Sequence, residues 1–101
     1  MAEFSKQGTV AIAGTTIHTG GSGGTYLSRV VTLRFNNTSA YNFKLQKYEA
    51  ATSTTTTIYD LTLSAGDTVT DNLTYVLNPG DKLIASSNIA GTTYYAYGID
   101  Y

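Results

Sequence analysis

The sequence predicts a single all-β domain, an antiparallel β-sandwich of the jelly-roll or immunoglobulin-like type with about seven or eight strands. Three observations lead to this prediction. Apolar and polar residues alternate with a period of two in several segments, turn-forming clusters recur about every ten residues, and helix signals are nearly absent. A chain of 101 residues is typical of one domain, and two sheets packed face to face bury the apolar side of each sheet economically.

The first 24 residues are predicted to form an N-terminal arm, ahead of a sandwich domain that takes residues 25–101. We expect an extended segment from about Gly8 to Ile17, followed by a Gly-rich loop up to residue 25. No helical pattern follows this loop, so phosphate binding at a helix N-terminus is not expected. We interpret the loop as a spacer and the arm as a segment able to reach a neighbouring subunit.

The clearest alternation lies in residues 29–36 and 41–46, where apolar residues at every second position are separated by polar ones. A turn-forming cluster, residues 36–39, lies between them. We interpret the two segments as a hairpin with one dry face and one wet face. The core predicted from this and later alternation comprises Val31, Leu33, Phe35, Phe43, Leu45, Tyr59, Leu61, Leu73, Tyr75 and Leu83.

Further strands are expected near residues 59–63, 73–77, 83–87 and 92–101. Two of the connecting segments, Leu63–Val69 and Leu77–Leu83, share an order of Leu, two spacers, Gly-Asp, one spacer and an apolar residue. We interpret this as the same turn chemistry used twice. Pro79-Gly80 favours a type II turn, which requires a positive φ at Gly80.

Composition excludes several classes of protein. The formal net charge is −1, and there is no basic stripe that would bind nucleic acid. The absence of cysteine excludes disulfides and thiolate zinc sites. No apolar segment approaches the length of a membrane-spanning helix, and the N-terminus lacks the apolar run of a signal peptide, so folding is expected in the cell that makes the protein.

The candidate catalytic and metal-binding residues have plainer explanations. His18 is the only histidine and lies beside the Gly-rich loop, so we expect an exposed residue at a strand end. Asp67, Asp71 and Asp81 could supply oxygen ligands for calcium or a carboxylate pair for glycoside hydrolysis. Aspartate in a turn, however, usually accepts hydrogen bonds from its own backbone. No catalytic residue, cofactor or metal is therefore expected.

Tyrosine is unusually frequent, with nine residues and no tryptophan, and four tyrosines lie in the last eight residues. A period of two places Tyr95, Tyr97 and Tyr101 on one face of the last strand and Tyr94 on the other. The main interpretation is that the first set lies in the core. The alternatives are a subunit interface, in which tyrosine supplies contact area and a hydroxyl, and a platform for sugars. The candidate interface residues are Tyr94, Tyr95, Tyr97 and Tyr101.

From Arg29 onward the sequence resembles small virion structural proteins of tailed bacteriophages. The resembling features are a strand that ends in Asn36-Asn37-Thr38, Phe43 and Leu45 in the next strand, the two Gly-Asp turn segments, and a closing strand after Ala90-Gly91. The resemblance covers most of the chain and rests on turn motifs. It implies a β-sandwich present in many copies on a particle, without catalytic residues.

The leading expectation is therefore a bacteriophage virion protein that is not an enzyme. It would be a capsid decoration or head-fibre subunit, folded in the host bacterial cytoplasm before assembly, with a neck or tail component as the alternative. Low charge and exposed strands favour contacts between identical subunits, with a trimer as the first expectation, and with other virion proteins. Nucleic acid and membrane are not expected as partners. The rival class is a carbohydrate-binding β-sandwich module, whose partner would be a host surface glycan.

Overall fold

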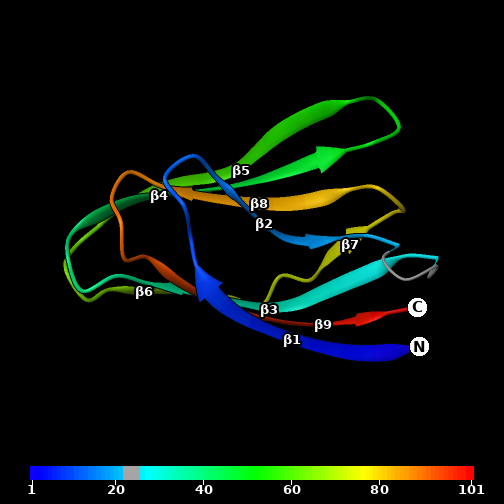
Figure 1. The fold of residues 1–101 in the computed structure, drawn as a ribbon, viewed down its shortest axis with the longest axis horizontal. Coiled ribbons are helices and arrows are strands. Elements are labelled where there is room, and N and C mark those ends of the chain that lie inside the picture. Colours follow the sequence, from blue (N-terminus) through cyan, green and yellow to red (C-terminus); the bar gives the residue numbers. More distant parts are fainter. Residues whose placement is uncertain (22–25) are drawn as a thin grey trace.

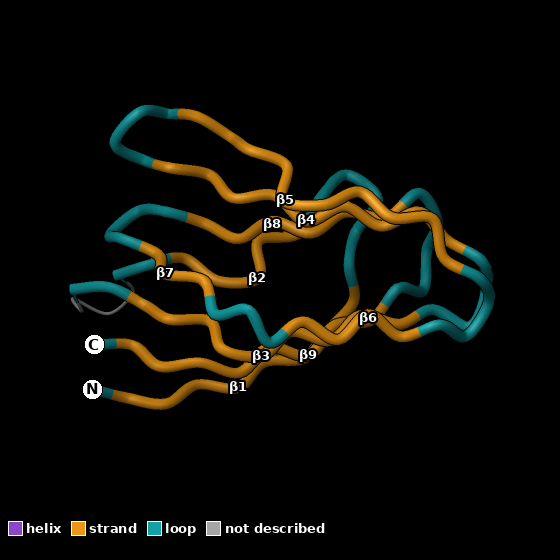
Figure 2. The backbone as a smooth tube through the Cα atoms, turned by 180° about the vertical axis from the view of Figure 1, so that it is seen from behind, coloured by secondary structure: helices purple, strands orange, loops and turns teal. Residues whose placement is uncertain are grey.

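The computed structural model describes residues 1–21 and 26–101, which form nine β-strands in two layers (Figure 2). The alternation of apolar and polar residues explains most of these strands, because one side of each lies against the other layer. The strands are β1 (Ala2–Thr9), β2 (Thr15–Thr19), β3 (Ser28–Asn36), β4 (Tyr41–Glu49), β5 (Thr54–Leu63), β6 (Thr68–Asp71), β7 (Tyr75–Leu77), β8 (Lys82–Ser87) and β9 (Thr93–Asp100).

The two layers are antiparallel sheets. Sheet A has the order β1-β9-β3-β6, with β7 also paired to β3, and sheet B has the order β2-β8-β4-β5 (Figure 1). This arrangement confirms the predicted antiparallel β-sandwich. In the described part of the chain there is no helix long and apolar enough to cross a membrane.

The structure differs from the predicted N-terminal arm, because within residues 1–21 strand β1 belongs to sheet A and strand β2 to sheet B. β1 pairs with β9 along its whole length, and β2 pairs with β8. Val10 and Ile17 are each 1% exposed and belong to the core, so this segment is held in the sandwich by burial as well as by hydrogen bonds. Residues 22–25 of the predicted Gly-rich loop lie outside the described residues.

Strands β3 and β4 do not form the predicted hairpin. β3 lies in sheet A and β4 in sheet B, so residues 37–40 cross from one layer to the other. The buried side chain of Asn37 holds this crossing, since its Nδ2 donates to the carbonyl oxygen of Ala90 at 3.1 Å and to Oγ1 of Thr92 at 2.9 Å. The two apolar faces therefore meet across the core and do not lie side by side.

The core lies between the sheets, with the rings of Phe35 and Phe43 in contact at a centroid distance of 4.1 Å. Half of the predicted core residues are fully buried, namely Leu33, Phe35, Phe43, Leu45 and Leu83. The buried core also contains residues outside the predicted set, namely Val10, Ile17, Val30, Tyr41, Leu77, Ala85 and Ala96.

The other predicted core residues are less buried, for different reasons. Leu73 is wrong as a core residue: it is 75% exposed and lies in the loop between β6 and β7, beside Thr74, whose φ of 62° turns the chain. Val31 is half-buried because it is the extra residue of a bulge, and Val30 takes its place in the core. The remaining three, which are half-buried, are Tyr59, Leu61 and Tyr75.

The two similar turn segments have the same conformation. In residues 64–67 and 78–81, the N–H of the fourth residue donates to the carbonyl oxygen of the first, at 3.1 and 2.9 Å. The carboxylate of the fourth residue, an aspartate, accepts the N–H of the first at 3.1 and 3.0 Å. The third residue has positive φ, 80° at Gly66 and 88° at Gly80. These values confirm both the repeated turn chemistry and the positive φ predicted at Gly80.

Candidate functional site

The outer side of sheet A carries the most distinctive described surface of the molecule, which we call the tyrosine face. The register of β1, β9 and β3 places outward side chains in rows that cross the three strands, seen side by side in Figure 1. Outward orientation follows from the alternate residues of β9, Ala96 and Gly98, which are buried. The rows are Gln7–Tyr95–Arg34, Ser5–Tyr97–Thr32 and Glu3–Ile99–Arg29.

A shallow hollow of about 480 Å³ lies on this face and is lined by Thr32, Arg34, Tyr95 and Tyr97. Desolvation, together with the charge of Glu3 and a hydrogen bond to it, raises the pKa of Tyr97. Tyrosine and arginine on an open surface are the residue types that dominate binding energy at protein interfaces.

A β-bulge brings Arg29 and Arg34 to the same face. The two residues are an odd number of positions apart, so strict alternation would place them on opposite sides of the sheet. The pairing with β9 shifts between Val30 and Thr32, which leaves Val31 as the extra residue and reverses the alternation. Arg29 consequently points outward, with its guanidinium 5.2 Å from the centroid of the Tyr101 ring.

The glycine opposite this bulge is required by the packing. A Cβ atom at Gly98 would collide with the carbonyl oxygen of Arg29 and with the ring of Phe4. Gly98 therefore lets β3 and the Phe4 side chain approach β9 from two sides. Arg29, Arg34 and Glu3 were not among the residues selected from the sequence, because a single bulged residue gives no signal in the pattern of residue types.

The predicted interface tyrosines are divided between the two sides of β9. Tyr95 and Tyr97 point outward, and Tyr101 joins them through its contact with Arg29. Tyr94 points the other way and packs against the core. The main interpretation of the outward set as core residues is wrong, because the inward side of β9 is filled by small residues and by the Phe4 ring. Whether the outward set forms an interface stays a prediction.

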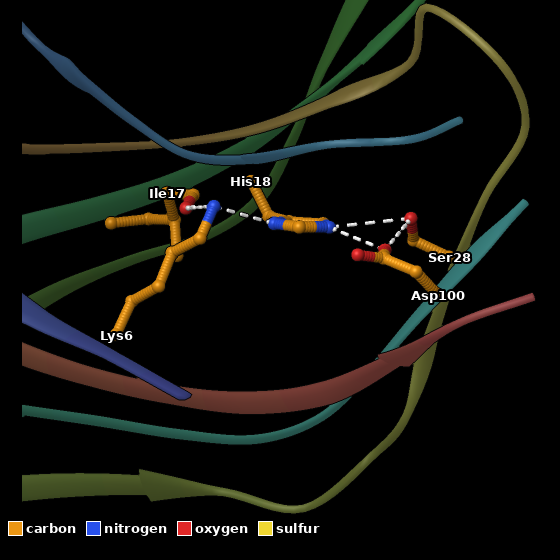
Figure 3. A network of polar contacts seen from close by, with 5 residues as sticks. All are labelled: Lys6, Ile17, His18, Ser28 and Asp100. Carbon is orange, nitrogen blue, oxygen red and sulfur yellow. Dashed lines mark hydrogen bonds and ion pairs between the residues drawn. The ribbon is translucent and has the colours of Figure 1, made fainter. Parts of the chain in front are cut away.

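His18 is buried, at 3% exposure, and is not the exposed strand-end residue that was predicted. Figure 3 shows it between Lys6 on one side and Asp100 and Ser28 on the other. Nδ1 of His18 lies 2.7 Å from Nζ of Lys6, and Nε2 lies 2.9 Å from Oδ1 of Asp100 and 3.2 Å from Oγ of Ser28. The reason is a register shift in β2 before His18, which leaves His18 and the preceding Ile17 both buried.

The geometry fixes the protonation of this network. The ammonium group of Lys6 can only donate, so Nδ1 of His18 accepts and Nε2 carries the hydrogen that faces Asp100. Burial, aided by the charge of Lys6, lowers the pKa of His18 although the bond to Asp100 acts in the opposite direction. Burial would raise the pKa of Asp100, but hydrogen bonds from Ser28 and His18 and the nearby charges leave it below its ordinary value.

The same network joins the two sheets at one side of the sandwich. Lys6, Ser28 and Asp100 belong to sheet A, whereas His18 belongs to sheet B. The ring of Phe4, also from sheet A, stacks on the imidazole at a centroid distance of 3.9 Å and an interplanar angle of 7°. We call this group the histidine clamp.

The histidine clamp does not have the geometry of a catalytic triad. Ser28 and Asp100 both lie at Nε2 of His18, whereas a triad needs them on opposite ring nitrogens. Lys6 occupies the other nitrogen. Ser28 is also 0% exposed, so a substrate could not reach its hydroxyl without movement of the sheets.

A second clamp closes the opposite side of the sandwich. Asp71 of β6 is 6% exposed, and its Oδ2 accepts hydrogen bonds from the hydroxyls of Tyr59 and Tyr75 at 3.0 and 2.6 Å. Tyr59 comes from sheet B and Tyr75 from sheet A. Burial, and then the contact with Asp71, raise the pKa of both tyrosines. We call this group the tyrosine clamp.

The turn aspartates considered as metal or glycosidase carboxylates are used in local hydrogen bonds. Asp67 and Asp81 accept backbone N–H groups in the two similar turns, and Asp81 also accepts the N–H of Ala50 at 2.9 Å. Asp71 is held in the tyrosine clamp. Over residues 1–21 and 26–101, no three His, Asp or Glu side chains gather in a way that could hold a metal ion.

No family model matches the sequence. No curated protein matches it either. The tyrosine face is therefore the structural observation from which a function can be proposed.

Proposed function

We propose that this chain is a structural subunit of a bacteriophage particle, of the capsid decoration or head-fibre type, that acts through protein–protein contacts of its tyrosine face. The observation that carries the proposal is the gathering of Tyr95, Tyr97, Arg29 and Arg34 on one open sheet surface. Such residues contribute most of the binding energy in protein interfaces. A neck or tail position in the same particle would use the same surface.

Two further features support this proposal. The clamps and the filled core hold both sheets in place, so the tyrosine face is presented as a rigid surface and little entropy is lost on binding. The sequence from Arg29 onward, with its two Gly-Asp turns, resembles small virion proteins of tailed bacteriophages. Charged residues make up only 13% of the chain, which suits repeated contact with other protein.

The test is the presence and copy number of the chain in purified particles, measured by mass spectrometry. Many tens of copies would support a head position, and six or twelve copies would support a neck or tail position. Purified protein should also add to particles that lack it, and Tyr95→Ala with Tyr97→Ala should abolish this binding. Lys44→Ala, on the outer side of sheet B, is the control. Absence of the chain from particles would contradict the proposal.

A second candidate is a carbohydrate-binding module, favoured by the hollow between Thr32, Arg34, Tyr95 and Tyr97. Aromatic rings beside hydroxyl and guanidinium groups are a combination suited to a sugar ring, which has both apolar and polar faces. A protein of this class should migrate as a monomer and be retarded in electrophoresis through gels that contain a glycan. A particle subunit should not be retarded, and should instead bind to particles.

A further inference from the structure

The polar groups of the tyrosine face are arranged so that the face is complementary to itself. Glu3 on β1 and Arg29 on β3 lie in the same row, on either side of Ile99 on β9. In another row, Gln7 and Arg34 lie on either side of Tyr95. The acceptor groups are therefore on the β1 side of β9, and the two guanidinium groups are on the β3 side.

We infer that the tyrosine face binds the same face of a second copy of this chain, about a two-fold axis that runs along β9. Such a rotation brings β1 of one copy opposite β3 of the other and leaves each row level with its counterpart. Glu3 then meets the partner's Arg29, and Gln7 meets the partner's Arg34. Tyr97 meets its own counterpart beside the axis. Because the contact is two-fold, every pair occurs twice.

The charges select this orientation over the other two-fold arrangement. An axis across the strands would keep β3 opposite β3 and would place Arg29 against the partner's Arg34. Like charges at that distance repel each other. In the described part of the chain the histidine–carboxylate contact is that of neutral His18 with Asp100, and neither arginine is paired with a carboxylate. The contact of Glu3 with the hydroxyl of Tyr97 is to a neutral group, which leaves the charge of Glu3 available.

The size of the face sets the strength of the contact. At about 4.8 Å between strands and about 3.3 Å per residue, the three strands of the tyrosine face offer a footprint of roughly 15 by 25 Å. This footprint is smaller than the roughly 800 Å² that each partner buries in a standard interface. The isolated dimer should therefore be weak and concentration-dependent, whereas many copies held on one particle would strengthen it by effective concentration. A two-fold contact yields pairs of subunits in place of the trimer expected from composition.

The inference rests on the proposed function, and its test is the mass of the full chain in solution. Sedimentation equilibrium up to a concentration of about 1 mM should show the mass rise toward twice that of the monomer. Glu3→Arg alone and Arg29→Glu alone should each weaken association by about tenfold or more, because each places like charges together. Lys44→Glu, on the outer side of sheet B, is the matched control and should dimerise like the original chain.

Mixing the two single variants gives the decisive result. In the mixed dimer, both contacts between position 3 of one chain and position 29 of the other again join an arginine to a glutamate. The equimolar mixture should therefore regain the dimer that each variant alone has lost. A loss of folding is monitored by thermal melting of each variant, and the mixture would not repair it.

The pairing in the mixed dimer follows from the rows of the face. Position 3 of the Glu3→Arg chain meets position 29 of the Arg29→Glu chain, and the unchanged Arg29 of the first chain meets the unchanged Glu3 of the second. Each of the two contacts joins opposite charges, whereas each variant paired with itself joins like charges twice. A cause inside one chain, such as the lost bond between Glu3 and Tyr97, would not be repaired by mixing.

Several outcomes would overturn the inference. These are a chain that stays monomeric at about 1 mM, a trimer mass, single variants that associate like the original chain, and a mixture that stays monomeric. A monomer that is retarded by polygalacturonate in affinity electrophoresis would overturn it as well and would assign the face to an acidic glycan. The proposed function is tested separately. A chain that fails to dimerise but adds to particles would support the proposed function and contradict the dimer. A chain that dimerises but is absent from particles would do the reverse.

Discussion

At the scale of single residues, His18 makes the stability of the fold depend on pH. Its pKa in the folded chain is lowered from the ordinary 6.5, chiefly by burial, so the unfolded chain binds the proton more readily. The contribution of His18 to the unfolding free energy is therefore complete above pH 6.5 and decreases as the pH falls below that value. Urea denaturation at several pH values should show this decrease, and His18→Gln should remove it. An unchanged pH dependence in the variant would contradict the prediction.

Phe43 and Leu73 test the assignment of the core. Phe43 is 0% exposed and packs against the ring of Phe35, so Phe43→Ala should lower the unfolding free energy by about 3–5 kcal/mol. Leu73 is 75% exposed, and Leu73→Ala should change the unfolding free energy by less than about 0.5 kcal/mol. The unfolding free energies of both variants are measured by urea denaturation. Equal losses would mean that the loop before β7 is packed differently.

The burial of single residues could be predicted from the sequence only where a strand is regular. Phe35, Phe43 and Leu45 follow strict alternation and are all fully buried. In β9 the alternation does not tell which side of the strand is buried, because tyrosine occurs both in cores and on surfaces. The side is decided by Phe4 of β1, whose ring fills the space over Gly98. A contact between residues so far apart in the chain leaves no trace in local alternation.

At the scale of elements, the two similar turns form a matched pair for a backbone test. Replacing Gly66 or Gly80 by alanine should destabilise the folded chain by about 1–2 kcal/mol, because a residue with a Cβ atom is strained at positive φ. A Cβ at Gly66 would meet nothing within 4 Å, whereas a Cβ at Gly80 would lie 2.9 Å from the Cβ of Ala50. Gly80→Ala should therefore lower the melting temperature more than Gly66→Ala. Equal shifts in thermal denaturation would show that Ala50 moves aside without cost.

The strands themselves could be predicted, but the way they pair could not. Residues 29–36 and 41–46 alternate equally well as a hairpin and as two strands that face each other across the core. Asn37, which holds the crossing between the layers, is one of several similar residues in a turn-forming cluster. The bulge at Val31, which turns Arg29 outward, and the shift before His18 are each a change of one residue. Register shifts of this kind depend on the partner strand and not on the strand's own sequence.

At the scale of the whole molecule, the N-terminal segment is expected to be essential for folding. A chain without residues 1–19 would lose β1 and β2, together with the buried Val10 and Ile17 and the histidine clamp. Loss of one edge strand from each sheet would expose β9 and β8 and open the core to water. Circular dichroism and proton NMR should show an unfolded or aggregated protein. A folded monomer would mean that the segment is an arm after all.

The two clamps give the sandwich a preferred direction of opening. On the side of β1 and β2 the link between the sheets passes through an imidazole, which gains a proton in mild acid and then faces the ammonium group of Lys6. On the side of β5 and β6 it passes through phenol hydroxyls, which stay protonated throughout that range. Acid should therefore separate the two edges at the first side while the second acts as a hinge. Amide hydrogen exchange should accelerate in β1 and β2 before it does in β5. The two sheets would then separate at the edge formed by β1 and β2 while they stay joined at Asp71.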